Sequence, residues 1–254
     1  MPGLQKKIRT MISKACFALF LSAGVCLPLK ATVIEMSMLI DGSGSVGSAN
    51  FQTQMQAYQS VFSNSFYSNF LNPGDQLYVS AYQFATNVTL EQSTFLIDSD
   101  ASATAFGTVL GNLVWDAGWT NTGAAIVEAL NDLNGNSVNG DRRLIHMVTD
   151  GNPCLPDHMG GCPQSVAQYA NTIFSEGIIL SAIGVGQGLN PLYIEPVTTH
   201  LDLIDDFSDL GSTLVDVFER DLHTEASSVP EPSTLLLLLS AFALLNLRGR
   251  YSVF

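Results

Sequence analysis

Residues 41–45, Asp-Gly-Ser-Gly-Ser, carry an acidic and two hydroxyl side chains at alternate positions of a glycine-rich loop. They follow the largely apolar run 36–40, which predicts a buried strand that ends at Asp41. Because the glycines let the backbone turn tightly, the oxygens of Asp41, Ser43 and Ser45 can face one point. Ligand sets made only of oxygen suit a hard cation such as Mg²⁺, so this segment predicts a metal site.

Two other segments carry oxygen ligands that could join this site. Segment 149–151, Thr-Asp-Gly, follows the apolar run 144–148, and segment 118–123, Gly-Trp-Thr-Asn-Thr-Gly, opens a helical pattern. In an open α/β sheet, ligands bind at the carboxyl ends of the strands. We therefore expect Thr120 and Asp150 to lie beside segment 41–45.

The elements that must position these side chains alternate between strand-like and helix-like patterns. We expect strands at 33–40, 76–84, 143–148 and 177–184, a weaker and short one at 89–97, and another short one near Leu201. We expect helices at 50–70, 101–113, 121–133, 164–175 and 209–222, and a short one near Pro191. Such alternation predicts an α/β fold with a doubly wound, mostly parallel central sheet and helices on both faces.

In their order and separation, the three motifs resemble the von Willebrand factor type A (vWA) domain with its metal-ion-dependent adhesion site (MIDAS), and the resemblance spans residues 32–223. It implies that Ser43 and Ser45 bind the metal directly through their hydroxyls. Thr120 would do so in the ligand-competent state, whereas Asp41 and Asp150 would act mainly through coordinated water. Mg²⁺ is the expected ion, with Mn²⁺ or Ca²⁺ as alternatives, and a partner's carboxylate would complete its coordination.

Three functions remain open at this point. The first is a metal-dependent adhesion or ligand-binding module, and the second is a structural matrix protein cross-linked by divalent cations. The third, a metal-dependent hydrolase, is disfavoured because no histidine or glutamate base is tied to the site, so we expect no enzyme. The metal could also merely brace the three loops, and Trp119 could either line the binding rim or pack under its loop.

The first 31 residues read as a signal peptide. Basic residues up to Lys14 precede the apolar run 15–29, and a small-residue cleavage site lies before Thr32. A lipoprotein signal would need Cys26 as its modified residue, and Val25 fits that poorly. The chain is therefore expected to be exported.

The C-terminal region carries a second segment that resembles a targeting signal. After the polar linker 224–229, segment 230–254 begins with Pro230-Glu231-Pro232 and continues as a leucine-rich helix that ends in two arginines. It resembles a PEP-CTERM sorting signal, although residues 251–254 extend beyond the arginines. The resemblance implies exosortase processing in a Gram-negative envelope, transient membrane association and release to the cell surface or extracellular matrix. Residues 234–247 make about 21 Å of helix, short of the roughly 30 Å bilayer core, so a retained anchor would have to tilt or snorkel.

Between these ends the chain is strongly acidic. From residue 32 to 229 it holds three arginines and 22 acidic residues, a net charge of −19. Such a field repels nucleic acid and anionic lipid. It favours solubility outside the cell, with calcium binding or steering of a partner as the alternative.

The cysteine pattern agrees with export. Cys16 and Cys26 belong to the signal, which leaves Cys154 and Cys162 close together in the domain. A close pair in an exported protein predicts a disulfide that closes a small loop. The alternative is a zinc site that also uses His158, for which no fourth ligand can be identified.

Overall fold

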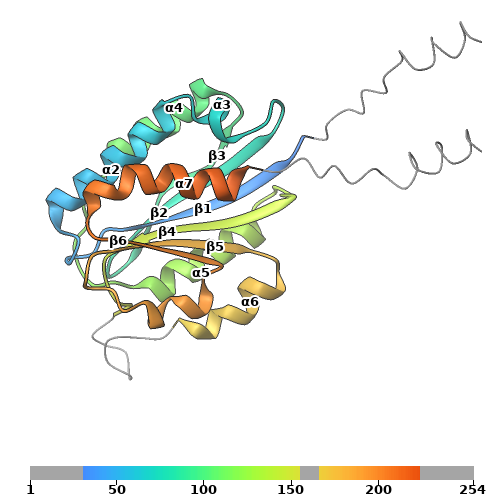
Figure 1. The fold of residues 1–254 in the computed structure, drawn as a ribbon. Coiled ribbons are helices and arrows are strands. Elements are labelled where there is room, and N and C mark those ends of the chain that lie inside the picture. The colour runs from blue at the N-terminus through green and yellow to red at the C-terminus, as the bar shows by residue number, and fades with distance from the viewer. Residues whose placement is uncertain (1–30, 155–165, 224–254) are drawn as a thin grey trace, which may run out of the picture. The chain divides into compact units, whose positions relative to one another are not determined.

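The computed structural model describes residues 31–154 and 166–223 (Figure 1). The predicted signal peptide, apart from residue 31, lies outside the described residues, as do the predicted linker and sorting signal. Among the described residues, no helix is long and apolar enough to span a bilayer.

The described residues form a six-stranded sheet in the order β3-β2-β1-β4-β5-β6. Every neighbouring pair is parallel except β2 and β3, which are antiparallel. This sheet confirms the predicted α/β class with a mostly parallel sheet. The strands are β1 (Val33–Asp41), β2 (Gln76–Phe84), β3 (Val88–Ile97), β4 (Arg142–Thr149), β5 (Ile179–Val185) and β6 (His200–Ile204).

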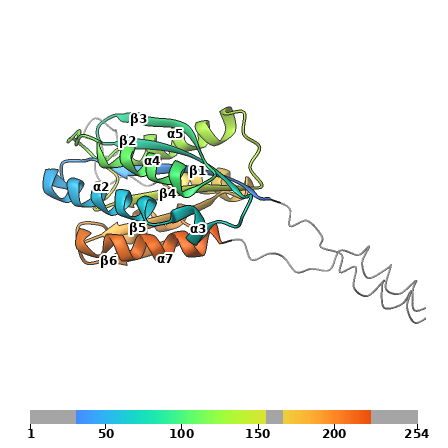
Figure 2. The same cartoon turned by 90° about the horizontal axis from the view of Figure 1, so that it is seen from above.

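Helices cover both faces of the sheet (Figures 1 and 2). One face carries α2 (Gly47–Ser63), α3 (Phe66–Phe70), α4 (Asp100–Gly111) and α7 (Leu210–Leu222). The other carries α5 (Thr122–Gly135) and α6 (Ala170–Ser175). Four short 3₁₀ turns complete the described elements: Ala167–Tyr169, Pro191–Tyr193, Glu195–Val197 and Phe207–Asp209.

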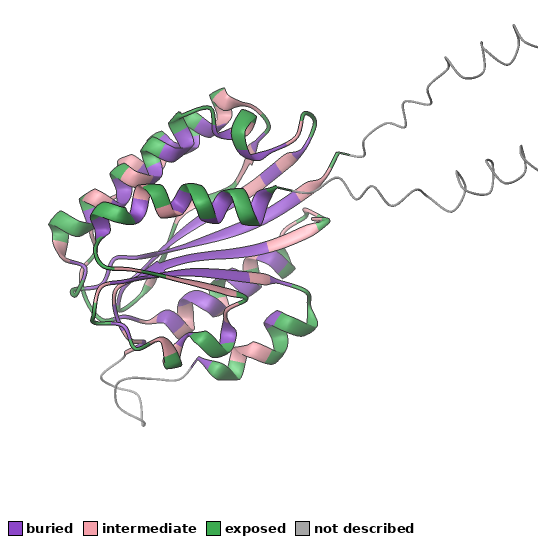
Figure 3. Ribbon diagram, viewed as in Figure 1, coloured by how far each residue is buried: buried purple, intermediate pink, exposed green. Residues whose placement is uncertain are grey.

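The two layers give the central strand a buried environment on both sides. Every residue of β1 from Ile34 to Asp41 is buried, as the purple strands of Figure 3 show. Successive side chains of a strand point to opposite faces, so Met38 packs in the core under α2 and α7, and Leu39 packs in the core under α5. This is why β1 reads as a continuous apolar run rather than an alternating one.

The structure differs from the sequence prediction at 50–70, where two helices replace one. Ser65 has a left-handed backbone with φ of 54° and separates α2 from α3. The break turns α3 so that Phe66 stacks on Phe62, with ring centroids 4.3 Å apart, and meets Phe218 of α7 edge-on. The aromatic cluster, and not helix propensity, decides where this helix ends.

The weaker strand predicted at 89–97 is present as β3 and begins one residue earlier. In the structure β3 spans ten residues and pairs with β2 along its length, with register shifts between Val79 and Tyr82. Most of its residues are half-buried or exposed, because β3 forms an edge of the sheet. Its weak apolar pattern reflects this edge position.

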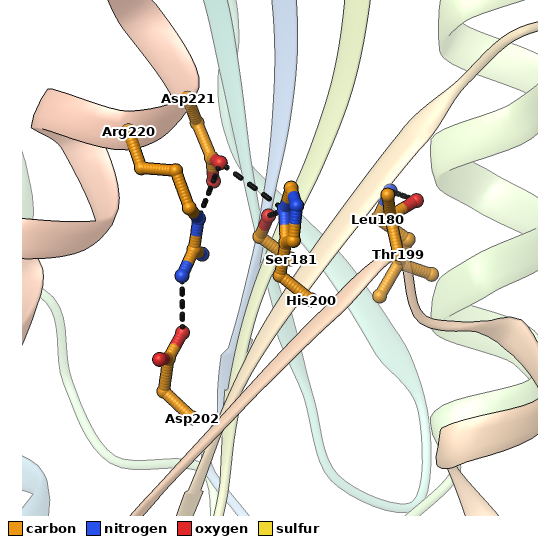
Figure 4. A network of polar contacts seen from close by, with 7 residues as sticks. All are labelled: Leu180, Ser181, Thr199, His200, Asp202, Arg220 and Asp221. Carbon is orange, nitrogen blue, oxygen red and sulfur yellow. Dashed lines mark hydrogen bonds and ion pairs between the residues drawn. The ribbon is translucent and has the colours of Figure 1, made fainter.

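A polar network fastens the end of α7 to the other edge of the sheet (Figure 4). Arg220 donates from Nε to Asp221 at 2.9 Å and from Nη1 to Asp202 of β6 at 3.0 Å. The Nδ1 atom of His200 lies 3.4 Å from the same Asp221 carboxylate. Asp221 is only 6 % exposed, so it depends on these partners to offset the loss of water.

Arg220→Ala is expected to destabilise the domain by about 2 kcal/mol, because it leaves the buried Asp221 carboxylate without its charged donor. Urea denaturation at pH 7 measures the change. Asp216→Ala is the matched control, since Asp216 is an exposed residue of the same helix and its loss should cost less than about 0.5 kcal/mol. Equal stability of the two variants would contradict the role assigned to Arg220.

Candidate metal centre

Asp41 ends β1 and is fully buried. Its Oδ1 atom accepts a hydrogen bond from the backbone N–H of Ser43 at 2.8 Å, and its Oδ2 atom accepts one from the Thr149 hydroxyl at 2.6 Å. Burial raises the pKa of Asp41 to about 6, opposed by these hydrogen bonds and assisted by repulsion from Asp150. An ionised Asp41 therefore lacks positive charge nearby, which a bound cation would supply.

Ser43 and Ser45 follow on the loop between β1 and α2. Their Oγ atoms lie 3.0 Å apart, so both hydroxyls face the same point. Ser45 also donates to Oδ1 of Asp150 at 2.7 Å. Burial raises the pKa of Asp150, and the hydrogen bond from Ser45 opposes that shift. The carboxyl ends of β1 and β4 thus meet at this group of oxygens.

Thr120 enters the same group from the loop before α5. It is 7 % exposed, and its carbonyl accepts a hydrogen bond from the Cys154 N–H at 2.7 Å. A Cβ atom added at Gly151 would lie 3.2 Å from the Ser45 Oγ and 3.4 Å from the Thr120 Oγ1. Both hydroxyls therefore lie close to Gly151 and to each other. The structure thus brings together all five residues that the sequence predicted: Asp41, Ser43, Ser45, Thr120 and Asp150.

The loop between α4 and α5 is held against segment 41–45 by two hydrogen bonds. The indole N–H of Trp115 donates to the Ser43 carbonyl at 3.1 Å, and the Gly44 N–H donates to the Gly118 carbonyl at 2.8 Å. Gly118 has φ of +119°, and a Cβ atom there would lie 2.5 Å from the Thr86 hydroxyl, so the close approach requires glycine. These contacts hold Ser43 and Thr120 in place before any ligand arrives.

Trp115→Phe is expected to weaken Mn²⁺ binding about tenfold, because the indole donor that orients Ser43 is lost while the ring still packs on the core. Isothermal titration calorimetry of the full chain measures the affinity. Val114→Ala serves as the control, since Val114 is 78 % exposed on the same loop and should leave Mn²⁺ affinity unchanged. Wild-type affinity in Trp115→Phe would contradict the bracing role.

A pocket of about 450 Å³ opens over these oxygens. Ser45, Thr120 and Asp150 line one part of it, and Trp119 lines another. Trp119 is 47 % exposed, so of its two predicted positions it occupies the rim rather than packing under the loop. Ser45, Thr120 and Asp150 thus face a space that a partner can enter, whereas Asp41 and Ser43 are fully buried.

The donor set fits a hard cation. It offers two carboxylates and three hydroxyls, with no sulfur or nitrogen, which is the ligand chemistry of Mg²⁺, Mn²⁺ or Ca²⁺. In the part of the chain that the structure describes, no group of three or more His, Cys, Asp or Glu side chains could hold a metal. A metal at this edge of the sheet would therefore depend on the serine and threonine hydroxyls.

Sequence reasoning missed two residues of the site. Thr149 was recognised only as part of its motif, yet its hydroxyl supports Asp41. Trp115 carried no signal, because its role depends on how the loop folds back over Ser43. His146 lies within β4 and is 2 % exposed, so it belongs to the core and not to the site.

The predicted disulfide lies only partly within the described residues. Cys154 is disulfide-bonded in the structure. Cys162 and His158, which the disulfide and the alternative zinc site would use, lie outside the described residues, so the pairing of Cys154 with Cys162 stays a prediction. The sorting residues Pro230, Glu231 and Pro232 lie outside them too.

The fold defines an α/β domain, and the three motifs form a candidate ligand site at the carboxyl edge of its sheet. The chain belongs to the von Willebrand factor type A domain family, whose model matches residues 35–212. It is also similar to human vitrin, with 26 % identity over 232 residues, 90 % of this chain and 31 % of vitrin. The chain thus spans about a third of the length of the curated relatives it matches.

Solved structures share the fold at low sequence identity. One is proximal thread matrix protein 1 of the mussel byssus, in a structure with a zinc-occupied MIDAS motif (TM-score 0.58, 18 % identity, 74 % of this chain and 48 % of that one). Another is the pilus adhesin SpaC of Lactobacillus rhamnosus GG (TM-score 0.58, 12 % identity, 76 % of this chain and 31 % of that one). At these identities the likeness concerns the fold alone.

Proposed function

We propose that the chain is an exported adhesion or ligand-binding module that holds an acidic group of its partner through a divalent cation. One observation carries the proposal: five oxygen-bearing side chains from three loops lie together, and three of them, Ser45, Thr120 and Asp150, line an open pocket. Membership of the vWA family supports it, and so do the names of two proteins with the same fold, a byssus matrix protein and a pilus adhesin.

The five residues of this site would bind the metal in two ways, directly or through water. The hydroxyls of Ser43, Ser45 and Thr120 would bind Mg²⁺ directly, with Mn²⁺ or Ca²⁺ as substitutes. Asp41 and Asp150 would act through water and keep Ser43 and Ser45 in place, since Asp41 accepts a hydrogen bond from the Ser43 N–H and Asp150 accepts one from the Ser45 hydroxyl. When bound, the ion supplies a positive centre that neutral hydroxyls leave incompletely compensated, so a partner's carboxylate is attracted to it.

The proposed place of action is outside the cell. The predicted signal peptide and PEP-CTERM segment support export through a Gram-negative envelope, with exosortase as the processing partner, and release to the surface or matrix. The charge of −19 over residues 32–229 supports a partner that is protein rather than nucleic acid. We propose no catalytic function.

Retention of the full chain on matrix material from its parent organism tests the proposal. We expect retention in 1 mM Mg²⁺ (about a physiological level), release by chelator, and loss in Asp41→Ala, because the buried carboxylate organises segment 41–45. Asp216→Ala, which changes an exposed acid of α7, should be retained like wild type. Equal retention with and without chelator would overturn the proposal.

A structural role in the matrix is the second candidate, and the acidic surface favours it. Within residues 32–229, 22 acidic residues face only three arginines, and two of these, Arg143 and Arg220, already pair with acids. Divalent cations could therefore cross-link neighbouring copies. This function predicts aggregation in millimolar Ca²⁺ that survives Asp41→Ala, whereas metal-dependent adhesion is lost in that variant.

A further inference from the structure

Gln83, near the end of β2, has a fully buried amide that is not among the five residues of the proposed metal centre. Its Nε2 atom donates to the Val114 carbonyl at 2.9 Å and to Oε1 of Glu91 at 3.0 Å. Its Oε1 atom accepts a hydrogen bond from the Asp116 N–H at 3.2 Å. A single side chain thus joins β2 both to the edge strand β3 and to the loop between α4 and α5.

The same amide packs against segment 41–45. A Cβ atom added at Gly42 would lie 2.2 Å from Oε1 of Gln83 and 2.8 Å from its Cδ, so a larger residue there would push the amide away from its partners. The Gly42 N–H donates to the Phe84 carbonyl at 2.8 Å, which fixes this segment beside the end of β2. Gln83 therefore contacts both the segment that carries the two serines and the loop that leads to Thr120.

The position of this loop depends on Gln83. The two backbone groups of the loop that Gln83 binds lie on either side of Trp115 in the sequence. The indole N–H of Trp115 donates to the Ser43 carbonyl at 3.1 Å, and Thr120 follows on the same loop. Loss of the amide would leave a backbone donor and a backbone acceptor of the loop without their partner, so the loop would be free to move away from Ser43.

We propose that Gln83 is a positioning residue for the metal centre, which holds the loop between α4 and α5 so that Thr120 lies beside Ser43 and Ser45. This inference rests on the proposed function, in which the three hydroxyls bind the cation. Gln83 does not bind the metal itself and acts through the loop and through its packing on Gly42. Metal affinity and loop order should therefore fall together when the amide is lost, whereas a side chain that only stabilises β2 would change neither.

Gln83→Met in the full chain tests this role, because methionine keeps the length of the side chain and removes its three hydrogen bonds. Isothermal titration calorimetry should show Mn²⁺ affinity reduced about tenfold. Both tryptophans of the chain lie in the loop, so acrylamide quenching of their fluorescence reports loop order in chelator, without metal. Quenching should be stronger in Gln83→Met than in wild type, because the Trp115 indole is no longer held against Ser43.

Ser80→Ala is the matched control. Ser80 is a buried residue of the same strand, and its hydroxyl donates to Asp132 of α5 rather than to the loop. The variant should lower the stability measured by urea denaturation, because Asp132 loses a hydrogen bond. Its Mn²⁺ affinity and its tryptophan quenching should equal those of wild type, which separates loss of stability from loss of loop position.

A double-mutant cycle tests the contact with Gly42 without relying on Gln83→Met. Gly42→Ala should weaken Mn²⁺ binding about tenfold in wild type, where its methyl group displaces the amide, but less than about twofold in Gln83→Ala, where the methyl group has room. Wild-type affinity or wild-type quenching in Gln83→Met, or equal losses from Gly42→Ala in both backgrounds, would overturn the role of Gln83 and leave the adhesion site standing. If wild type binds no Mn²⁺, the proposed function and this inference both fail.

Discussion

Replacing Asp41 by asparagine is expected to abolish the stabilisation of this domain by divalent cations. In wild type, Mg²⁺ or Mn²⁺ at a hundredfold excess over its dissociation constant should add about 2.7 kcal/mol. For a domain of this size that raises the unfolding temperature by about 5–10 °C. Asparagine can still accept from the Ser43 N–H, so the loop keeps its hydrogen bond while the negative charge is lost.

Differential scanning calorimetry with added Mn²⁺ and with chelator measures this effect. In chelator at pH 7, Asp41→Asn should be at least as stable as wild type, because it no longer buries an uncompensated carboxylate. Asp216→Asn is the matched control and should gain as much from Mn²⁺ as wild type does. A cation-induced gain of wild-type size in Asp41→Asn would contradict the assignment of this site.

The second large effect concerns the stability of the domain at low pH and arises from a residue in the core. His146 is buried in β4, and its Nε2 atom is 3.0 Å from the Tyr58 hydroxyl of α2. Burial lowers its pKa to about 4; Asp221 of α7 and Asp202 of β6 oppose the shift, and Arg220 of α7 adds to it. The unfolded chain therefore binds a proton at a pH where folded His146 stays neutral.

The sign of the effect follows from that difference. The stability due to neutral His146 is complete above pH 6.5 and is lost as pH falls to about 4, in total about 3 kcal/mol. His146→Gln cannot titrate but can still hydrogen-bond Tyr58. Relative to wild type, the variant should therefore gain about 3 kcal/mol between pH 7 and pH 4.

Urea denaturation of both proteins across this pH range gives the difference curve. Asp41 has the opposite effect on stability, because its raised pKa makes the metal-free fold more stable at low pH. Asp41 is present in both proteins, so its contribution cancels in the difference curve. A flat difference curve would show that His146 is not held neutral in the fold.

Much of the fold could be predicted because the signals are local. The apolar run of β1 and the alternation of strands and helices follow directly from burial on both faces of a parallel sheet. The break at Ser65 could not be predicted, because it depends on Phe66 and Phe218, which are distant in sequence, meeting in the core. The bounds of β3 were predicted to within one residue, although an edge strand carries a weak apolar pattern.

The candidate site, like the fold, could be predicted only in part from the sequence. Its five predicted residues sit in short motifs at strand or helix ends, where the topology of a parallel sheet brings them together. The supporting contacts from Trp115 and Thr149, and the rim position of Trp119, depend on how the loops fold over one another. No local pattern encodes these contacts, so only the structure reveals them.

A crystal structure of the full chain with Mn²⁺, examined by its anomalous signal, tests the central claim most directly. We predict one strong peak bordered by the hydroxyls of Ser43, Ser45 and Thr120, and its absence in crystals of Asp41→Asn. A Mn²⁺ peak elsewhere on the acidic surface, with none beside these hydroxyls, would contradict the claim that this site holds the cation through which the domain binds its partner.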